Sequence, residues 1–356
     1  MKQAVILGAG VMGAALTVPL AENGVRATIV GTPFDAGAVT QIQQTGYHPA
    51  LQQPLPVGTT AVLAESSPGR VAEAFGSADL VVVGVASAGA QWAAEQLRAH
   101  LRPDTAILTV TKGLTVESTG TVRTIKHVFT DALPTELVEA TTWVAACGPS
   151  IAGEVADRVD TVVRFAGTDG AGNEATADLF RTDRYHVRTS TDEKGAEVCA
   201  ATKNLFALAV GYGEGLGDRE QHATPSGDQD SINAGAALFT QALLEMRALV
   251  HLVGGNPKTV DGLAGTGDLF VTCAGGRNVR AGRFLGGGAT VTELRDRYMP
   301  GETVEGLAAL EVVGAGLQRL AERGFGRPGR FPLTEFLYSV VIGGRAASVP
   351  WGTLLD

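Results

Sequence analysis

The chain has 356 residues, of which 45% are hydrophobic and 18% are charged, and its formal net charge is −9. This length exceeds what one hydrophobic core usually serves, so we expect two domains that fold without disulfide or metal staples. The negative charge argues against a general affinity for nucleic acid or anionic membranes, although it leaves room for a local cationic pocket that binds a small anion.

Cysteine usage and hydropathy favour a cytoplasmic enzyme. The three cysteines, Cys147, Cys199 and Cys273, lie far apart in the sequence and have neither disulfide-framework nor zinc-ligand spacing. The apolar start of the chain is too short for a signal peptide, and no apolar run reaches the length of a membrane span. We therefore expect a protein of the reducing cytoplasm with no membrane span.

The first motif begins at residue 4. Ala4–Leu7 is a continuous apolar run, typical of a strand buried on both faces of a parallel sheet. The sequence GAGVMG follows, and a helix is predicted from Val11 to Asn23, capped by Gly24. In a dinucleotide-binding fold, three such glycines serve the tight turn, the approach of the pyrophosphate and helix packing, and here they are Gly8, Gly10 and Gly13.

The second strand, Val25–Val30, leads to the residues that would contact the adenosine ribose. Enzymes that use NAD usually offer an acid at this place, and enzymes that use NADP offer a nearby arginine. Here the strand runs into GTPFD, in which Thr32 comes first and Asp35 stands late, and no Lys or Arg occurs between Arg26 and Arg70. The sequence therefore leans to NAD and leaves NADP open.

Strands and helices continue to alternate after this point. Further strands are predicted at 78–85, 105–110, 142–146 and 160–166, and the sheet domain closes near residue 191. This alternation predicts a doubly wound parallel sheet whose ligands lie at the carboxyl ends of the strands. Ser87, Lys112 and the turn Gly148-Pro149-Ser150 follow three such ends. For Lys112, a solvated loop lysine is the alternative.

Helical patterns predominate from Asp192 onward, so the second domain should be mostly α-helical. Helices are predicted over 193–212, 233–252, 304–322 and 334–345. The polar segment Asp218–Ser231 lies between the first two helices and predicts a mobile loop, in which His222 is most simply a solvated histidine.

The first of these helices is apolar, yet it contains Lys203 and Asn204. A lysine there either extends its ammonium to water or lies in a low-dielectric pocket, where desolvation lowers its pKa toward the range useful for proton transfer. The composition of the helix leaves both alternatives open. The helix also contains glycines at which its backbone can be approached closely: Gly211, Gly213 and Gly215.

Glycine concentrates again in the stretch Gly262–Gly288, which reads GLAGTGDLFVTCAGGRNVRAGRFLGGG. So much glycine predicts a close approach of the backbone to another group. Arg277 and Asn278 follow a flexible Gly-Gly pair and form a fork of donors suited to a phosphate. A surface salt bridge is the alternative for Arg277.

Taken together, these motifs resemble the NAD(P)-dependent glycerol-3-phosphate dehydrogenases, in order and over nearly the whole chain. The matching motifs are GxGxxG at 8–13, TKG at 111–113, GPS at 148–150, KN at 203–204, GxGDLxxTC at 265–273, RN at 277–278 and VEG at 304–306. Ketopantoate reductases and hydroxyisobutyrate-type dehydrogenases share the first motif but lack the GDLxxTC and RN block.

The resemblance implies an α/β N-terminal Rossmann domain of residues 1–191 and an all-α C-terminal substrate domain of residues 192–356, like that of 6-phosphogluconate dehydrogenase. It implies reversible reduction of dihydroxyacetone phosphate to sn-glycerol 3-phosphate with NAD or NADP, a role in supplying phospholipid precursors, and no metal. The large apolar helices favour a homodimer.

The resemblance also implies roles for individual residues. Lys203 matches the family's catalytic lysine, which protonates the ketone oxygen during reduction, and Lys112 matches a second lysine that would lower the pKa of Lys203 further. Asp268 and Thr272 match residues that orient the lysine and the substrate. The residues implied for substrate binding are Asn204, Arg277, Asn278, Ser150 and Gly148. The residues implied for cofactor binding are Gly8, Gly10, Val11, Met12, Gly13, Thr32, Ser87, Lys112, Ala152, Arg277 and Glu305.

The chain departs from the family pattern in four places. Val85-Ala86-Ser87 stands where a proline is usual, Asp157–Asp160 replaces a segment rich in Gly and Pro, Gln241 stands where an arginine is common, and the loop Asp218–Ser231 is longer than the usual connection. These departures spare the two lysines, and they raise the alternative of another polyol or ketose phosphate as substrate.

Two alternatives come from other classes. One is a dehydrogenase of the same superfamily that uses Arg277 to bind a carboxylate substrate. The other is a non-catalytic nucleotide sensor, against which the presence of Lys112, Lys203 and Asp268 argues, because a sensor needs only the cofactor half.

Overall fold

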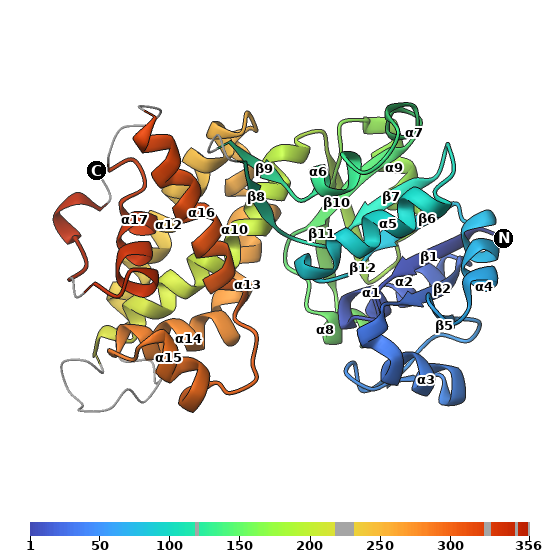
Figure 1. The fold of residues 1–356 in the computed structure, drawn as a ribbon, viewed down its shortest axis with the longest axis horizontal. Coiled ribbons are helices and arrows are strands. Elements are labelled where there is room, and N and C mark those ends of the chain that lie inside the picture. Colours follow the sequence, from blue (N-terminus) through green and yellow to red (C-terminus); the bar gives the residue numbers. More distant parts are fainter. Residues whose placement is uncertain (118–120, 218–230, 324–328, 346–347, 355–356) are drawn as a thin grey trace. The chain divides into compact units, whose positions relative to one another are not determined.

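The computed structural model describes residues 1–117, 121–217, 231–323, 329–345 and 348–354 (Figure 1). The chain divides into two compact units. Unit 1 comprises residues 1–112 and 125–193, and unit 2 comprises residues 113–124 and 194–356. The predicted loop Asp218–Ser231, with His222, lies outside the described residues except for Ser231.

Unit 1 is built around an eight-stranded sheet. In spatial order the strands are β12 (Tyr185–Ser190), β11 (Thr161–Ala166), β10 (Thr142–Cys147), β7 (Ala106–Thr109), β6 (Leu80–Val83), β1 (Gln3–Leu7), β2 (Arg26–Gly31) and β5 (Thr60–Leu63). β11 runs antiparallel to β10, whereas every other pair of neighbours is parallel. The predicted doubly wound parallel sheet is confirmed, with the reversal at β10–β11 as its one departure.

The strands are continuous apolar runs because both faces of the sheet are buried. In β6 all four residues are buried, and they alternate between two cores: Leu80 and Val82 belong to one, Val81 and Val83 to the other. The period of two along a strand produces this division. The helices of unit 1 are α1 (Val11–Ala15), α2 (Thr17–Glu22), α3 (Ala36–Thr45), α4 (Pro68–Gly76), α5 (Ala90–His100), α6 (Lys126–Thr130), α7 (Thr135–Glu139), α8 (Ala152–Ala156) and α9 (Gly170–Asp178).

The prediction of one continuous helix from Val11 to Asn23 is wrong, because the structure has two helices, α1 and α2, separated at Leu16. Pro19 has no N–H to donate to the preceding turn, and the Thr17 hydroxyl donates to the Ala14 carbonyl at 2.6 Å. The predicted end is confirmed, since Gly24 adopts a left-handed conformation with φ +70°.

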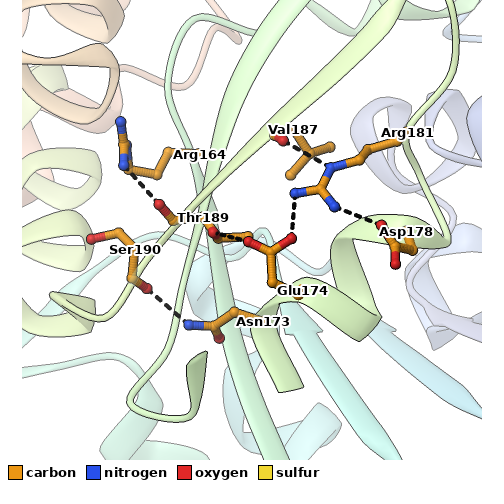
Figure 2. Close-up of polar contacts among 8 residues, drawn as sticks. All are labelled: Arg164, Asn173, Glu174, Asp178, Arg181, Val187, Thr189 and Ser190. Atoms are coloured by element: carbon orange, nitrogen blue, oxygen red, sulfur yellow. Dashed lines mark hydrogen bonds and ion pairs between the residues drawn. The ribbon is translucent and has the colours of Figure 1, made fainter. Parts of the chain in front are cut away.

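Polar side chains hold α9 against the reversed edge of the sheet (Figure 2). Asn173 is fully buried, and its Nδ2 donates to the Ser190 carbonyl at 2.9 Å. Glu174 accepts a hydrogen bond from the Thr189 hydroxyl and pairs with Arg181 at 2.7 Å. The Thr189 hydroxyl and the Arg181 guanidinium hold the pKa of Glu174 below its usual range. These contacts join α9 to β12 through side chains as well as through apolar packing.

Unit 2 is mostly helical, as predicted. Its helices are α10 (Glu193–Glu214), α12 (Ile232–Leu252), α13 (Asp268–Cys273), α14 (Arg277–Gly286), α15 (Val291–Glu293), α16 (Glu305–Glu322) and α17 (Pro332–Leu337), with Glu193 itself counted in unit 1. The helix predicted over 334–345 is instead α17 followed by a π-helical turn at Tyr338–Ile342. In the described part of the chain, no helix is long and apolar enough to cross a membrane.

A hairpin from the middle of the first half of the chain belongs to unit 2, contrary to the predicted division at residue 191. It consists of β8 (Leu114–Val116) and β9 (Val122–Thr124). Its side chains pack on α16 at Gly316, where an added Cβ would lie 2.9 Å from Val116 Cγ2. The contact spans about two hundred residues, and for that reason no local pattern announces it.

Helices α10 and α14 approach each other closely at glycines. A Cβ added at Gly211 would lie 2.1 Å from the carbonyl oxygen of Val279, and one added at Gly282 would lie 2.2 Å from that of Leu208. Both neighbours are backbone atoms that cannot swing aside. The close backbone approach predicted for both glycine-rich stretches is therefore confirmed at these positions, and the group approached is the other helix.

A buried carboxylate joins α12 to the start of α17. Glu245 is 1% exposed, and its Oε1 accepts hydrogen bonds from Leu333 N at 2.6 Å and Gln241 Nε2 at 3.0 Å. Its Oε2 accepts from Thr334 N at 3.0 Å and from the Thr334 hydroxyl at 2.6 Å. Burial raises the pKa of Glu245, and these hydrogen bonds oppose the rise. Gln241, one of the departures from the family pattern, thus helps to satisfy a buried acid.

Replacing Glu245 by alanine is expected to lower the free energy of unfolding by about 3 kcal/mol, because four buried donors would lose their acceptor. The free energy of unfolding is measured by urea denaturation, with circular dichroism as the signal. The control is Glu311→Ala on an exposed position of α16, for which a change within about 0.5 kcal/mol is expected. If the two variants lost the same free energy of unfolding, the buried hydrogen bonds of Glu245 would not be what stabilises the protein at this position.

Candidate active site

The glycine turn after β1 lies where the strand connections of unit 1 diverge. From β1 the sheet continues to β2 on one side and to β6 on the other, and such a switch point is where open α/β sheets bind ligands. Gly8 has φ +96°, and a Cβ there would lie 3.2 Å from Val85 N. A Cβ on Gly13 would lie 2.8 Å from Ile6 Cγ2. The turn and packing roles predicted for these two glycines are confirmed.

The turn has the properties that a pyrophosphate site requires. Gly10 is exposed and carries no side chain, so a ligand can approach the main chain there, whereas Gly8 is buried and shapes the turn. Val11 and Met12 begin the helix that follows, and the Ser150 hydroxyl lies 3.9 Å from Met12 Sδ. The residues present therefore fit a dinucleotide cofactor.

The acid after β2 is directed toward the glycine turn. Asp35 Oδ2 accepts hydrogen bonds from Thr32 N and Thr32 Oγ1, both at 2.8 Å, and from Ala9 N at 3.1 Å. Asp35 thus ties the end of β2 to the turn after β1. The sequence indicated only that Asp35 stands late for a ribose contact, and its contact with Ala9 requires the tertiary fold.

A hollow lies beside these residues, at the carboxyl ends of β2 and β5. It is open to solvent. The residues that line it are Thr32, Pro33, Ala36, Leu63, Ala64, Glu65 and Ser66. Sequence reasoning missed β5, and with it Glu65 and Ser66. The available signal was the short apolar run TAVL before them.

The other predicted residues of unit 1 also follow strand ends. Ser87 begins a 3₁₀ turn after β6, and Lys112 follows β7 closely. Gly148 has φ +106° in the turn after β10, where Ser150 shares a hydrogen bond with the buried Tyr185. Ala152 then begins α8. Because these strands are parallel, all of these residues lie on the edge of the sheet that also carries the glycine turn.

Lys203 of α10 forms a buried ion pair with Asp268, the first residue of α13. The Lys203 side chain is 11% exposed and that of Asp268 is fully buried. Of the two alternatives for Lys203, extension to water and a low-dielectric setting, the structure shows the second. A positive charge held in such a setting acts more strongly on a neighbouring oxygen than it would in water.

Asp268 reaches this position through a π-helical turn, Leu263–Gly267. Gly265 makes that turn possible, since a Cβ there would lie 2.3 Å from the Val260 carbonyl oxygen. Thr272 lies one turn further along α13, and its hydroxyl donates to the Asp268 backbone carbonyl at 2.6 Å. The hydroxyl of Thr272 therefore supports the helix that carries the acid.

Arg277 begins α14 and pairs with Glu305 at the start of α16, with 2.7 Å between Nη2 and Oε1. The two side chains are 51% and 41% exposed. The surface salt bridge, one of the two alternatives for Arg277, is thus present. An ion pair this exposed contributes about 0–1 kcal/mol, so exchange of the carboxylate for another anion costs little.

Asn204 and Asn278 meet at the start of α16. The Asn278 side-chain oxygen accepts a hydrogen bond from Gly306 N at 2.8 Å, and a Cβ on Gly306 would lie 2.5 Å from the Asn204 carbonyl oxygen. The glycine of VEG therefore lets α16 start directly against α10. Asn278, which is predicted to offer N–H donors to the substrate, uses its amide oxygen to hold this junction.

Unit 2 thus brings together the residues that the motifs separate by about a hundred positions. Lys203, Asn204, Asp268, Arg277 and Glu305 are linked through α10, α13, α14 and α16. Lys112 belongs to unit 1, so its pairing with Lys203 stays a prediction. Within the described residues, no group of His, Cys, Asp or Glu side chains is arranged to hold a metal ion.

The thiol next to this cluster is expected to be unreactive. Burial, with a smaller contribution from the negative charge of Glu214, raises the pKa of Cys273 to about 12. At pH 8 only about one molecule in 10⁴ then carries the thiolate, and the fraction grows as the pH rises toward 12.

Alkylation of Cys273 by iodoacetamide at pH 8 should therefore be about 100-fold slower or more in the folded protein than in urea. Peptide mass spectrometry at several times measures both rates. Equal rates would show that Cys273 carries an accessible thiolate.

Comparison with known proteins gives one family over most of the chain. The profile described as NAD-dependent glycerol-3-phosphate dehydrogenase N-terminus matches residues 3–171, and the one described as its C-terminus matches residues 192–349. An NADP(+)-dependent glycerol-3-phosphate dehydrogenase of Archaeoglobus fulgidus is 33% identical over 288 residues, covering 81% of this chain and 81% of the relative. A glycerol-3-phosphate dehydrogenase, NAD(P)+, of Symbiobacterium thermophilum is 34% identical over 347 residues, covering 95% and 89%.

Solved structures agree. Glycerol-3-phosphate dehydrogenase of Coxiella burnetii superposes with a TM-score of 0.76 at 25% identity, covering 99% of this chain and 97% of that one. The enzyme of the same name from Plasmodium falciparum has a TM-score of 0.80 at 19% identity, covering 100% and 95%, and it shows the shared fold.

Proposed function

Because the chain belongs to the NAD-dependent glycerol-3-phosphate dehydrogenase family, it is an oxidoreductase that uses a nicotinamide cofactor, and we propose that it interconverts dihydroxyacetone phosphate and sn-glycerol 3-phosphate. The observation that carries the proposal is the buried Lys203–Asp268 pair. When bound, the cofactor supplies or accepts a hydride. The residues of the chain bind the substrate, orient it and move a proton.

Lys203 is the proposed general acid for reduction. As a ketone carbon is reduced, negative charge develops on its oxygen, and an ammonium within hydrogen-bond reach stabilises that charge and delivers the proton. In the oxidation direction the same amine accepts the hydroxyl proton. Asp268 restricts the ammonium to one direction from α13, so less conformational freedom is lost when the substrate binds.

Arg277 is the proposed phosphate ligand, with Asn204 beside it. A guanidinium has five N–H donors in a planar fork, so it can bind two phosphate oxygens at once in place of the Glu305 carboxylate. The low energy of the exposed Arg277–Glu305 pair supports this assignment, because the arginine gains a doubly charged partner at little cost.

The cofactor would be held at the carboxyl edge of the unit 1 sheet. The turn formed by Gly8, Gly10 and Gly13 would receive the pyrophosphate, with Ser87 and Ala152 on neighbouring strand ends. We propose that NAD is preferred over NADP. The support is the hollow after β2 and β5, whose described lining contains Glu65 and no Lys or Arg. The A. fulgidus relative is named as an NADP(+)-dependent enzyme, so membership of the family does not by itself decide between NAD and NADP.

Two other substrate classes are alternatives to dihydroxyacetone phosphate. A larger ketose or polyol phosphate would use the same lysine and arginine, and a carboxylate substrate would use Arg277 without need of phosphate. Competition by inorganic phosphate separates these classes, because only a site for a phosphorylated substrate binds it in competition with that substrate.

The test is oxidation of NADH and NADPH by the purified chain with dihydroxyacetone phosphate, followed by loss of coenzyme absorbance. We expect turnover with NADH, formation of sn-glycerol 3-phosphate detected by mass spectrometry, and competitive inhibition by inorganic phosphate. Binding of NADH without turnover, together with turnover of a different ketose phosphate, would assign the site to that substrate. Turnover of a carboxylate substrate that is insensitive to phosphate would overturn the proposal.

We also propose a homodimer in the reducing cytoplasm. All three cysteines carry thiols in the structure, which supports a reducing compartment. Helices as apolar as α12 support association of two chains. Light scattering of the purified protein tests the second point, and a mass equal to that of one chain at micromolar concentration would contradict it.

A further inference from the structure

The hollow at the ends of β2 and β5 is one strand removed from the glycine turn. Leu7 at the end of β1 pairs with Val30 of β2, and Gly31 of β2 pairs with Leu63 of β5. Gly8 N also donates to the Val30 carbonyl at 2.8 Å. If the pyrophosphate lies at the glycine turn, as the proposed function has it, the adenosine half extends over β2 toward this hollow.

Asp35 is the first acid after β2, although it stands late for a ribose contact, and its Oδ2 already accepts hydrogen bonds from three donors. Two of them belong to Thr32 and the third is Ala9 N, within the glycine turn. Asp35 is also absent from the lining of the hollow. Oδ2 of Asp35 therefore helps to position the glycine turn, and the carboxylate that lines the hollow belongs to another residue.

We propose that Glu65 is the residue that recognises the ribose hydroxyls and selects NAD(H) over NADP(H), and that Asp35 is a positioning residue for the glycine turn. Glu65 follows β5 by two positions, is exposed, and lines the hollow beside Ser66. A carboxylate accepts hydrogen bonds from two adjacent hydroxyls and repels a 2′-phosphate, which carries a charge of about −1.5 to −2. The inference rests on the proposed cofactor site and extends it.

The surroundings of Glu65 favour the same coenzyme. Among the described residues that line the hollow, Glu65 is the single charged one, and the remainder are apolar or hydroxyl-bearing. A 2′-phosphate would therefore meet a carboxylate without a compensating cation. A ribose diol would meet one acceptor in Glu65 and further hydroxyl partners in Ser66 and Thr32.

The experiment measures binding without any substrate. The dissociation constants of NADH and NADPH are determined by fluorescence titration for the natural protein, Glu65→Gln, Glu65→Arg and the control Glu73→Gln, which changes an exposed acid of α4. We expect NADH to bind about tenfold more tightly than NADPH to the natural protein and to Glu73→Gln. Glu65→Gln should weaken NADH binding about tenfold and so reduce the preference for NADH over NADPH. Glu65→Arg should reverse that preference, so that NADPH binds more tightly than NADH.

Asp35→Asn provides the second arm. Because Asp35 acts through the turn that both coenzymes share, we expect both dissociation constants to rise by the same factor of about ten, with their ratio unchanged. Thermal unfolding of each variant shows whether the fold is retained. A change in the ratio for Asp35→Asn, with none for Glu65→Gln, would assign ribose recognition to Asp35 and overturn the inference.

The outcomes separate this inference from the proposed reaction. Tight NADH binding that depends on Glu65, without turnover of dihydroxyacetone phosphate, would keep the inference and overturn the substrate. Turnover with equal affinity for both coenzymes in the natural protein and in Glu65→Gln would keep the reaction and overturn the inference. Binding of neither dinucleotide would overturn both.

Discussion

Lys203→Ala is expected to lower kcat for reduction of dihydroxyacetone phosphate by about 10³-fold, while the dissociation constant of NADH stays unchanged. The loss follows because the developing charge on the ketone oxygen would no longer meet an ammonium held by Asp268. NADH binding is spared because the residues proposed for the pyrophosphate and adenosine belong to unit 1. Steady-state kinetics and fluorescence titration measure the two quantities.

Lys194→Ala is the matched control, since Lys194 is an exposed lysine on the same helix, α10. It should leave kcat within about twofold of the natural value. Asp268→Asn tests the partner: it retains the shape of the acid and removes its charge, and we expect a smaller loss of kcat, of about 10²-fold. Near-natural turnover by folded Lys203→Ala would exclude Lys203 as the proton donor.

Gly211→Ala is expected to destabilise the protein by about 3 kcal/mol or more. The added methyl would lie 2.1 Å from a backbone carbonyl of α14, so the two helices must separate to admit it. Separation would also disturb the Lys203–Asp268 pair, because Lys203 lies two turns earlier on the same helix. Urea denaturation measures the stability, and kcat at a temperature well below the transition measures the effect on the site.

Gly37→Ala in α3 is the control for this substitution. Apart from the adjoining backbone of α3, no atom lies within 4 Å of a Cβ added at Gly37, so alanine there should be neutral or stabilising by up to about 1 kcal/mol through its helix propensity. If both variants retain natural stability, the close contact between α10 and α14 does not restrict residue 211 to glycine.

The locally encoded parts of the fold are predictable from the sequence. The run AVIL followed by GAGVMG places β1 and the glycine turn, because strand burial, turn conformation and helix packing each leave a mark within a few neighbouring residues. The predicted long helices agree for the same reason with α10, α12 and α16 to within two residues at each end. Local breaks such as Leu16 are missed, since apolar periodicity continues through them.

The candidate site is only partly predictable. The motifs resemble one family strongly enough to single out Lys203, Asp268 and Arg277, and the comparisons show the same family. The partners of these side chains follow from the packing of helices. Glu305 pairs with Arg277 because α14 and α16 begin next to each other. Gly306 allows the first turn of α16 to lie directly against Asn204.

The sequence by itself determined the Rossmann-type sheet, the helical second half and the family, and it singled out the candidate site residues, because those features depend on local periodicity and on motif order. Only the tertiary structure decided that Lys203 is buried against Asp268, that Asp35 serves the glycine turn, and that Glu65 lines the hollow beside it. Each of these is a contact between segments far apart in the chain. The free energy of such contacts depends on burial and geometry that exist only after the elements have packed.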